Sequence, residues 1–234
     1  MSSRLREIAR ENATILAAGG YRTRTGRQIS LAAALVEAKA GTRIYGPNRV
    51  IPYGEPLTKE GKTAFEVTGE SSTVAAHRLA KDAPRGVRVA YTDRVIHSPA
   101  VPVFRDDRGG LLETPFPVAF LTSPAPNAGT IRRQEPERAH EIPGALARRA
   151  ELVLEVAALH GHRRLVLGAW GCGVFRNEPA AVAEAFRELL TGRFDGVFER
   201  VVFGVLDRAP EPRQAFERAF AGLCAEPGST DPGH

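Results

Sequence analysis

The amino-acid sequence predicts an α/β fold, and its last third carries the clearest signal. Between 145 and 224 the pattern alternates helix, strand, loop, helix, strand and helix. Apolar residues recur at helical spacing over 145–160, whereas 163–170 and 200–206 contain short apolar runs typical of buried strands. Because strands joined through a helix pair in parallel by a right-handed crossover, this order predicts a mixed, mostly parallel sheet.

The first third is predicted to be mainly helical. Apolar side chains at near-helical spacing indicate a helix over 2–17, which Gly19 and Gly20 end. Ser30 is a candidate N-cap for a second helix. A loop rich in proline and glycine, a short strand and a further helix are expected next, at 48–62, 65–68 and 72–81.

The middle of the chain is less regular. The segment 85–104 alternates in places and contains two prolines, which suits short strands joined by turns. A turn is expected over 106–110 and a buried strand over 117–122. The segment 131–144 is polar and is predicted to be exposed.

Three helices are expected in the last third. The first presents one apolar face, formed by Leu146, Ala150, Val153, Leu154 and Ala157. The second follows the loop 171–177, with Asn177 as its candidate N-cap and Pro179 in its first turn. The third is expected over 211–224.

Composition indicates one globular domain in a chain of 234 residues. No apolar run approaches the roughly 20 residues that cross a bilayer, and the first residues lack the apolar core of a signal peptide. We therefore expect a cytoplasmic protein without membrane association. The two cysteines, Cys172 and Cys224, belong to no cluster with metal-ligand spacing, so we expect no disulfide, no metal and no cofactor.

The chain is basic, with a formal net charge of +5 at pH 7 and a pI near 9.6. Its positive charge is mostly arginine scattered among acidic residues, which is typical of a solvated surface. A basic protein nevertheless favours a polyanionic ligand. Nucleic acid is one such ligand, but no helix-turn-helix or RNA-binding signature is present, so nucleic-acid binding is the weaker alternative.

The loop between the strand at 163–170 and the next helix carries the strongest functional signal. Its glycines allow positive φ and let backbone N–H groups approach a ligand closely. The helix N-terminus adds N–H donors and a partial positive charge, so the loop suits a diphosphate, although a tight structural turn is the alternative. Phe175 either packs on a ribose or anchors the loop in the core. The candidate ligand-binding residues are Gly168, Trp170, Gly171, Cys172, Gly173, Val174, Phe175, Arg176 and Asn177.

A second loop follows the strand at 117–122, at its carboxyl end, where α/β sheets bind ligands. Two prolines stiffen this loop, and Asn127 is suited to a hydrogen bond within a turn or to a ligand. By itself the signal is weak. The candidate residues are Ser123, Pro124, Ala125, Pro126 and Asn127.

Several segments resemble the microbial poly(ADP-ribose) glycohydrolase family, which has a macrodomain fold. The matching sequences are ENATILAAGGY, SPAVPVFRDDRGGLL, FLTSPAPNAG, LVLGAWGCGVFRNEPAAVAEAF and RVVFGVLD. AWGCGVFRN is highly specific, and the resemblance spans essentially the whole chain. It implies that the loop from Gly171 to Phe175 wraps the diphosphate of ADP-ribose, that Phe175 stacks near the distal ribose, and that 123–127 lines the same cleft.

The resemblance also refines the predicted fold. It implies a macrodomain-like three-layer α/β/α domain with a mixed, mostly parallel central sheet and an N-terminal helical extension. We expect a single domain over 1–225, which includes this extension at 1–64, and a disordered tail over 226–234. The implied partners are ADP-ribose or ADP-ribosylated macromolecules, and the oligomeric state stays open.

One segment of the family pattern is absent. The family carries its catalysis on a loop of several glycines followed by a Gln-Glu-Glu signature, expected between 86–89 and 90–99. Here these two segments run together, and the chain contains no Gly-Gly-Gly and no Glu-Glu pair. In the family the second glutamate of the signature protonates the leaving oxygen of the glycosidic bond. The catalytic residues of this chain are therefore unknown.

Four functions are compatible with this pattern. The leading hypothesis is an ADP-ribose-binding macrodomain of the bacterial glycohydrolase type, without glycohydrolase activity. The main alternative is an active ADP-ribosyl or poly(ADP-ribose) glycohydrolase with a non-standard acid, such as Asp106, Asp107 or Glu135. A third possibility is a gene lesion in an ordinary glycohydrolase, and the fourth is the basic nucleic-acid binder.

Overall fold

The computed structural model describes residues 3–46, 93–106, 108–205 and 210–223. The elements expected between 48 and 81, the junction after 86–89 and the tail over 226–234 lie outside these residues. The chain divides into two compact units. The described residues of the first unit are 3–44, 96–106 and 108–122, and those of the second are 45–46, 93–95, 123–205 and 210–223.

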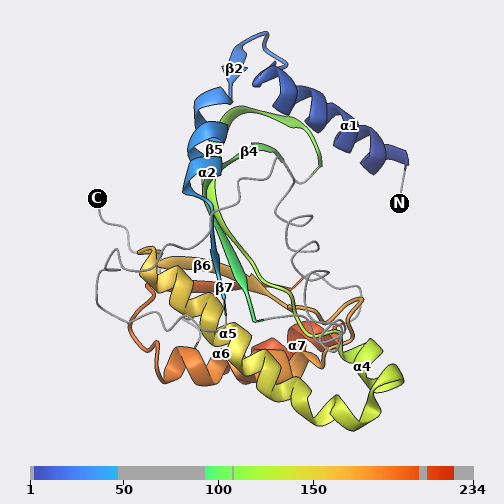
Figure 1. Cartoon of the computed structure of the whole chain (residues 1–234). Helices are drawn as coiled ribbons and strands as arrows, with labels where there is room; N and C mark the ends of the chain where they lie inside the picture. Colours follow the sequence, from blue (N-terminus) through green and yellow to red (C-terminus); the bar gives the residue numbers. More distant parts are fainter. Residues whose placement is uncertain (1–2, 47–92, 107, 206–209, 224–234) are drawn as a thin grey trace. The chain divides into compact units, whose positions relative to one another are not determined.

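The first unit combines two helices with short and long antiparallel strands (Figure 1). Its described elements are α1 (Ser3–Ala18), β1 (Gly20–Arg22), β2 (Gln28–Ser30), α2 (Ala32–Gly41), β3 (Arg43–Tyr45), β4 (Val95–Arg105) and β5 (Leu111–Thr122). β1 pairs with β2, and β3, β4 and β5 form a sheet in that order. A small core, formed by Ile15, Tyr21, Ile29 and Leu31, packs against Phe104 and Leu111.

The helix predicted over 2–17 is confirmed, and Gly19 follows it with a positive φ of 68°. The predicted cap of the second helix is wrong. Ser30 lies in β2, and Leu31 occupies the N-cap position of α2 without a side-chain hydrogen bond. The preference of serine for N-caps is local, and here the pairing of β1 with β2 outweighs it.

The described part of 85–104 is more regular than expected. β4 continues as one strand from Val95 to Arg105, with an irregular register between Ser98 and Val101. Ala100 lies in this irregularity with a positive φ of 49°. The irregular register therefore accommodates Pro99 within a long strand, whereas Pro102 stays in register opposite Pro117.

The strand predicted over 117–122 is present as the end of β5, but no residue of β5 is buried. Within the described part of the chain β5 pairs with β4 only, and its apolar side chains are partly exposed. The turn predicted over 106–110 is confirmed by the hydrogen bond from the Asp106 amide to the Gly110 carbonyl, at 2.9 Å.

The second unit consists of helices around one parallel strand pair. Its described elements are α4 (Ala128–Gln134), the 3₁₀ helix η2 (Pro136–Glu141), α5 (Ile142–Leu159), β6 (Arg164–Gly168), α6 (Pro179–Thr191), β7 (Arg200–Gly204) and α7 (Glu211–Ala219). The segment 131–144 is mostly exposed, as predicted, and it is also mostly helical. The apolar face predicted for 145–160 is buried in α5, as expected.

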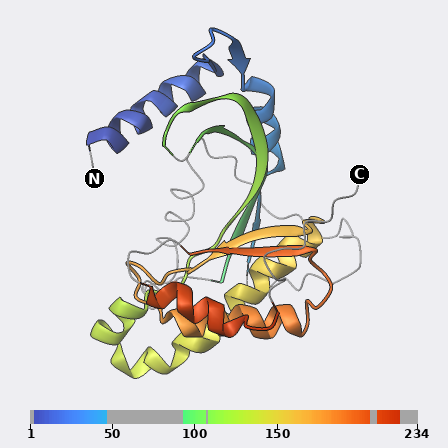
Figure 2. The same ribbon diagram turned by 180° about the vertical axis from the view of Figure 1, so that it is seen from behind.

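β6 and β7 pair in parallel, as the order of elements predicted. Helices α6 and α7 lie on the same face of this pair (Figure 2), where the Phe203 ring contacts Phe186, Phe216 and Phe220 at centroid distances of 6.0, 5.2 and 4.6 Å. On the opposite face Val166 is 80% exposed. Among the described residues, β6–β7 pairing is parallel, whereas β1–β2 and β4–β5 pairing is antiparallel, and these pairs belong to three separate sheets.

No helix among the described residues is both long and apolar enough to span a bilayer.

Candidate functional site

The glycine-rich loop between β6 and α6 is held together by its own backbone. The Cys172 amide donates to the Ala169 carbonyl, and the Asn177 amide donates to the Gly171 carbonyl, each at 3.1 Å. A further turn joins the Arg176 amide to the Gly173 carbonyl at 3.1 Å. These bonds fix the path of the loop before any ligand is considered.

Two amides of the loop remain available. Gly173 and Val174 are exposed, Val174 to 91%, and their N–H groups donate to no acceptor among the residues that the structure describes. The amide of Cys172 differs from the sequence-based expectation, because the turn to Ala169 already uses it. Donors for an anion are therefore found at the tip of the loop, one and two residues later.

Asn177 has a different role from the predicted N-cap. The N-cap of α6 is Glu178, while the Asn177 side chain is 2% exposed and faces into the protein. Its Nδ2 donates to the Pro126 carbonyl at 2.9 Å and to the Gly171 carbonyl at 3.1 Å. Asn177 therefore joins the two candidate loops.

Trp170 provides a second connection between the loops. Its indole Nε1 donates to the Ser123 carbonyl at 2.9 Å. The ring also packs near Phe186 of α6, with a centroid distance of 6.3 Å. The side chain of this candidate residue is thus occupied in supporting the loops.

The proline-containing loop 123–127 leads directly into α4. The Asn127 side chain accepts from the Thr130 amide at 3.1 Å and so caps that helix. Ala125 and Pro126 are buried, and a Cβ added to Gly171 would lie 2.5 Å from the Ala125 Cβ. The two loops are therefore in direct van der Waals contact, and Gly171, with φ of 72°, is the residue that permits it.

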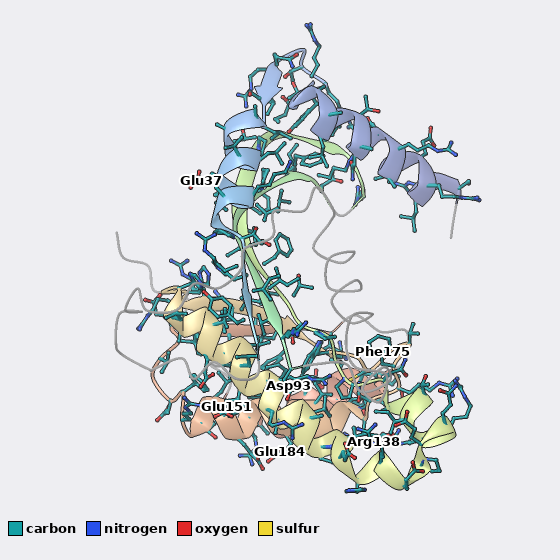
Figure 3. All side chains as sticks on the ribbon, viewed as in Figure 1. Glu37, Asp93, Arg138, Glu151, Phe175 and Glu184 are labelled. Atoms are coloured by element: carbon teal, nitrogen blue, oxygen red, sulfur yellow. The ribbon has the colours of Figure 1, made fainter. Side chains whose placement is uncertain are left out.

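Phe175 and Arg176 stand at the end of the loop, beside α4. The Phe175 carbonyl accepts from the Gly129 amide at 2.9 Å, and its half-buried ring is visible in Figure 3. Arg176 is exposed and has a positive φ of 54°, which is unfavourable for a residue with a side chain. Its carbonyl accepts from Arg132 Nη1 at 3.2 Å.

The N-terminus of α6 is less suited to an anion than the sequence suggested. Pro179 occupies the first helical position and has no N–H. The Glu178 carboxylate lies nearby and forms an ion pair with Arg132 at 3.5 Å. We therefore assign the anion-binding potential to the loop amides and not to the helix terminus.

Sequence reasoning missed the buried charge beneath the site. Arg149 lies in α5 at 2% exposure, and its guanidinium donates to Asp93 Oδ1 at 2.6 Å and to the Pro124 carbonyl at 3.0 Å. Burial raises the pKa of Asp93, but hydrogen bonds from Arg149 and Arg148 outweigh it and hold that pKa below its ordinary value. An arginine on the apolar face of a predicted helix was the available signal.

The acids considered as replacements for the missing catalytic glutamate are engaged elsewhere. Asp106 Oδ1 accepts from the Arg108 and Gly110 amides, at 2.9 and 2.7 Å, within the β4–β5 turn. Glu135 Oε2 accepts from Arg138 Nη1 at 2.6 Å. Asp107 lies outside the described residues. Within the described part of the chain, no group of three or more side chains is placed to hold a metal ion.

Known proteins give a consistent picture. A family model described as microbial-type PARG, catalytic domain, where PARG denotes poly(ADP-ribose) glycohydrolase, matches residues 9–89. PARG from Thermomonospora curvata is 39% identical, with a TM-score of 0.73, and the match covers 92% of this chain and 98% of that chain. A comparison with curated proteins finds no match.

PARG from Deinococcus radiodurans, crystallised in complex with ADP-ribose, also matches. In one crystal form it is 52% identical with a TM-score of 0.57, and the match covers 58% of this chain and 56% of that chain, or little more than half of its length. In another form it is 34% identical with a TM-score of 0.63, over 84% of this chain and 100% of that chain.

The match to the Thermomonospora protein extends over almost the whole of both chains, and its TM-score indicates a shared macrodomain-like α/β fold. The family model matches the N-terminal part of the chain independently. This chain belongs to the microbial-type poly(ADP-ribose) glycohydrolase family.

Proposed function

We propose that this chain binds ADP-ribose, with the amides of Gly173 and Val174 donating to the diphosphate and Phe175 beside the distal ribose. The observation that carries the proposal is the pair of exposed, uncommitted amides at the tip of a loop whose other bonds are internal. Adjacent backbone amides with no partner in the protein are a common means of binding phosphate. PARG from Deinococcus radiodurans was crystallised with ADP-ribose, and PARG from Thermomonospora curvata with the inhibitor ADP-HPD.

The remaining candidate residues support the loop in this proposal. Trp170 and Asn177 hold the glycine-rich loop against 123–127, and Gly171 allows the close approach. Arg176 adds positive charge beside the exposed amides. The natural ligands would be free ADP-ribose or ADP-ribosylated macromolecules in the cytoplasm.

We further propose that the chain has no glycohydrolase activity. The sequence has no Gln-Glu-Glu signature. A glycosidic bond does not break readily unless an acid protonates the leaving oxygen. Asp106 serves the β4–β5 turn, and Glu135 is paired with Arg138. The alternative, a glycohydrolase with one of these acids, would require it to leave its present partner.

Titration calorimetry with ADP-ribose tests the binding proposal. We expect a saturable heat, and a much weaker response to AMP, which has the adenosine but lacks the diphosphate. The absence of saturation at millimolar ADP-ribose would refute the proposal. Incubation with poly(ADP-ribose) tests the second part, because release of ADP-ribose that is lost in Glu135→Gln or Asp106→Asn would establish the alternative.

A single substitution tests the role of the loop amides. Val174 is the second residue of the turn closed by the Arg176 amide and the Gly173 carbonyl, a position where proline is favoured. Val174→Pro therefore removes one N–H with little expected change in stability, within about 1 kcal/mol. Losing a hydrogen bond to a charged phosphate should raise Kd by about tenfold or more.

The matched control is Val174→Ala, which removes the exposed side chain and retains the amide. We expect its Kd to remain within about twofold of the wild type, because a side chain exposed this far contributes little packing. Equal affinity of the proline and alanine variants would mean that the amide of residue 174 does not contact the ligand.

A further inference from the structure

Arg149 is the largest fully buried side chain among the described residues, and it carries a charge. Such residues are rarely buried unless they are paired. Two groups meet this guanidinium from distant parts of the sequence. Nε donates to Asp93 Oδ1 at 2.6 Å, and Nη1 donates to the Pro124 carbonyl at 3.0 Å. One side chain of α5 therefore holds both the residues before β4 and the start of the loop 123–127.

The ion pair between Arg149 and Asp93 does not by itself require Arg149 to contact the Pro124 carbonyl. Asp93 also receives Arg148 Nε at 3.1 Å, so its charge has another partner, one that is 61% exposed. The Pro124 carbonyl, in contrast, accepts a hydrogen bond from Arg149 and from no other side chain that the structure describes. The planar guanidinium has donors that diverge, which lets Arg149 satisfy a carboxylate and a carbonyl together.

The position of Pro124 determines where the carbonyls of Ser123 and Pro126 lie. Ser123 precedes it and accepts from Trp170, and Pro126 follows it and accepts from Asn177. Because the prolines leave this short loop few conformations, a shift at Pro124 would be transmitted to both. Both acceptors lead to the glycine-rich loop and its exposed amides.

We propose that Arg149 is a positioning residue for the ligand site, with Asp93 as its counter-ion. Arg149 fixes the Pro124 carbonyl. The hydrogen bonds of Ser123 with Trp170 and of Pro126 with Asn177 then fix the glycine-rich loop. This proposal rests on the proposed function for its consequence in binding. Its structural part, the order of the two loops, does not depend on a ligand.

Arg149→Lys separates the two contacts of the guanidinium. Lysine retains a positive charge opposite Asp93, but its single ammonium group cannot reproduce the fork that also reaches the Pro124 carbonyl. Arg149→Met removes both contacts and leaves Asp93 without its buried partner, so this variant risks failing to fold. Arg148→Met is the matched control, because it removes the exposed arginine that contacts the same carboxylate.

Trp170 allows the loops to be observed without ligand, because it is the single tryptophan of the chain and its indole binds the Ser123 carbonyl. For Arg149→Lys we expect a thermal midpoint lowered by a few degrees, because the Pro124 carbonyl loses a charged donor within the protein. We also expect a red-shifted Trp170 emission with stronger acrylamide quenching, and a Kd for ADP-ribose raised about tenfold. Arg148→Met should match the wild type in emission and in Kd.

The outcomes are distinct. Unchanged emission and unchanged Kd in Arg149→Lys would overturn the proposal and reduce Arg149 to a buried ion-pair partner. Changes in Arg148→Met as large as those in Arg149→Lys would also overturn it, because charge at Asp93 alone would then control the loop. Altered emission in Arg149→Lys together with a wild type that fails to bind ADP-ribose would support the loop anchoring and refute the proposed function.

Discussion

The two loops of the candidate site contrast in the backbone groups they offer. The loop 123–127 contributes carbonyls, which accept from Trp170, Arg149 and Asn177 side chains. The loop 168–177 contributes amides, two of which are exposed at its tip. Proline has no N–H, whereas glycine lets the backbone approach a partner closely, so the composition of each loop matches what it offers.

The loop 123–127 supports the site, whereas the glycine-rich loop provides the groups that would contact a ligand. The carbonyls of the loop 123–127 accept hydrogen bonds from the protein itself, whereas the Gly173 and Val174 amides of the glycine-rich loop remain for an anion. This arrangement makes the glycine loop dependent on the proline loop. Perturbing the contact between them should therefore have larger effects than perturbing the exposed tip.

The largest effect is expected for Gly171→Ala. The new Cβ would lie 2.5 Å from both the Ala125 Cβ and the Asn177 Nδ2, and the residue would keep a φ of 72°. Left-handed backbone costs about 1–2 kcal/mol and overpacking about 1–3 kcal/mol, so we expect a loss of about 2–5 kcal/mol in the free energy of unfolding. Chemical denaturation monitored by Trp170 fluorescence measures it.

Gly173→Ala is the control within the same loop. A Cβ at this position meets no atom within 4 Å, and its φ is not in the left-handed region. We expect a change in stability within about 0.5 kcal/mol. If Gly171→Ala and Gly173→Ala lost similar stability, close contact with the loop 123–127 would not be the reason that residue 171 must be glycine.

The next largest effect is expected for Asn177→Ala. It removes the side-chain hydrogen bonds to the Pro126 and Gly171 carbonyls, each of which keeps a backbone donor, so we expect a loss of about 0.5–1.5 kcal/mol for each bond. Asn127→Ala removes an asparagine from the other loop, where it caps α4, and should cost about 1 kcal/mol. Thermal unfolding of both variants compares the two roles, and equal losses would contradict the bridging role of Asn177.

Local patterns predicted much of this second unit. The apolar face of α5 and the parallel pairing of β6 with β7 followed from periodicity and element order, because both are encoded over short stretches. Asn177 was assigned as an N-cap by the same local logic. Its actual acceptor at Pro126 lies in another loop, and no local pattern reports such a contact.

Distant pairing also explains the other misses. Local patterns assigned no role to Arg149, because Asp93 and Pro124 are far from it in the chain. The strand over 117–122 was predicted to be buried because its residues are apolar, but burial depends on what covers a strand, and among the described residues β5 pairs with β4 only. Composition identifies the two loops, and the bonds between them require the structure.

Acid should weaken the anchor of the proline loop. The pKa of Asp93 is lower in the folded protein than its ordinary value of about 3.9, so its pairing stabilises the fold above that pH and is lost as the pH falls through the lowered pKa. We expect Asp93→Asn to be less stable than the wild type near neutrality, and the difference to shrink in acid. Thermal melts over this range measure it.

Glu184→Gln is the control for general acid effects. The hydrogen bond from Arg187 also lowers the pKa of Glu184, but that pair lies on the surface of α6, where ion pairs contribute little. Its melts should follow those of the wild type at every pH. A difference between Asp93→Asn and the wild type that did not depend on pH would show that the Asp93 charge is not the stabilising feature.

The smallest effect is expected for Arg176→Gly, which tests the exposed end of the glycine loop. Arginine at a φ of 54° is strained, and glycine relieves that strain while losing more conformational entropy on folding, so we expect a net gain of about 0.5–1 kcal/mol. Affinity for ADP-ribose should fall, because a positive charge beside the diphosphate is removed. Arg176→Asn, neutral and tolerant of this φ, separates charge from flexibility. Higher stability with lower affinity for ADP-ribose in both variants would indicate that the strain at Arg176 is retained for binding. Unchanged affinity would mean that this end of the glycine-rich loop, like the loop 123–127, supports the fold and does not contact the ligand.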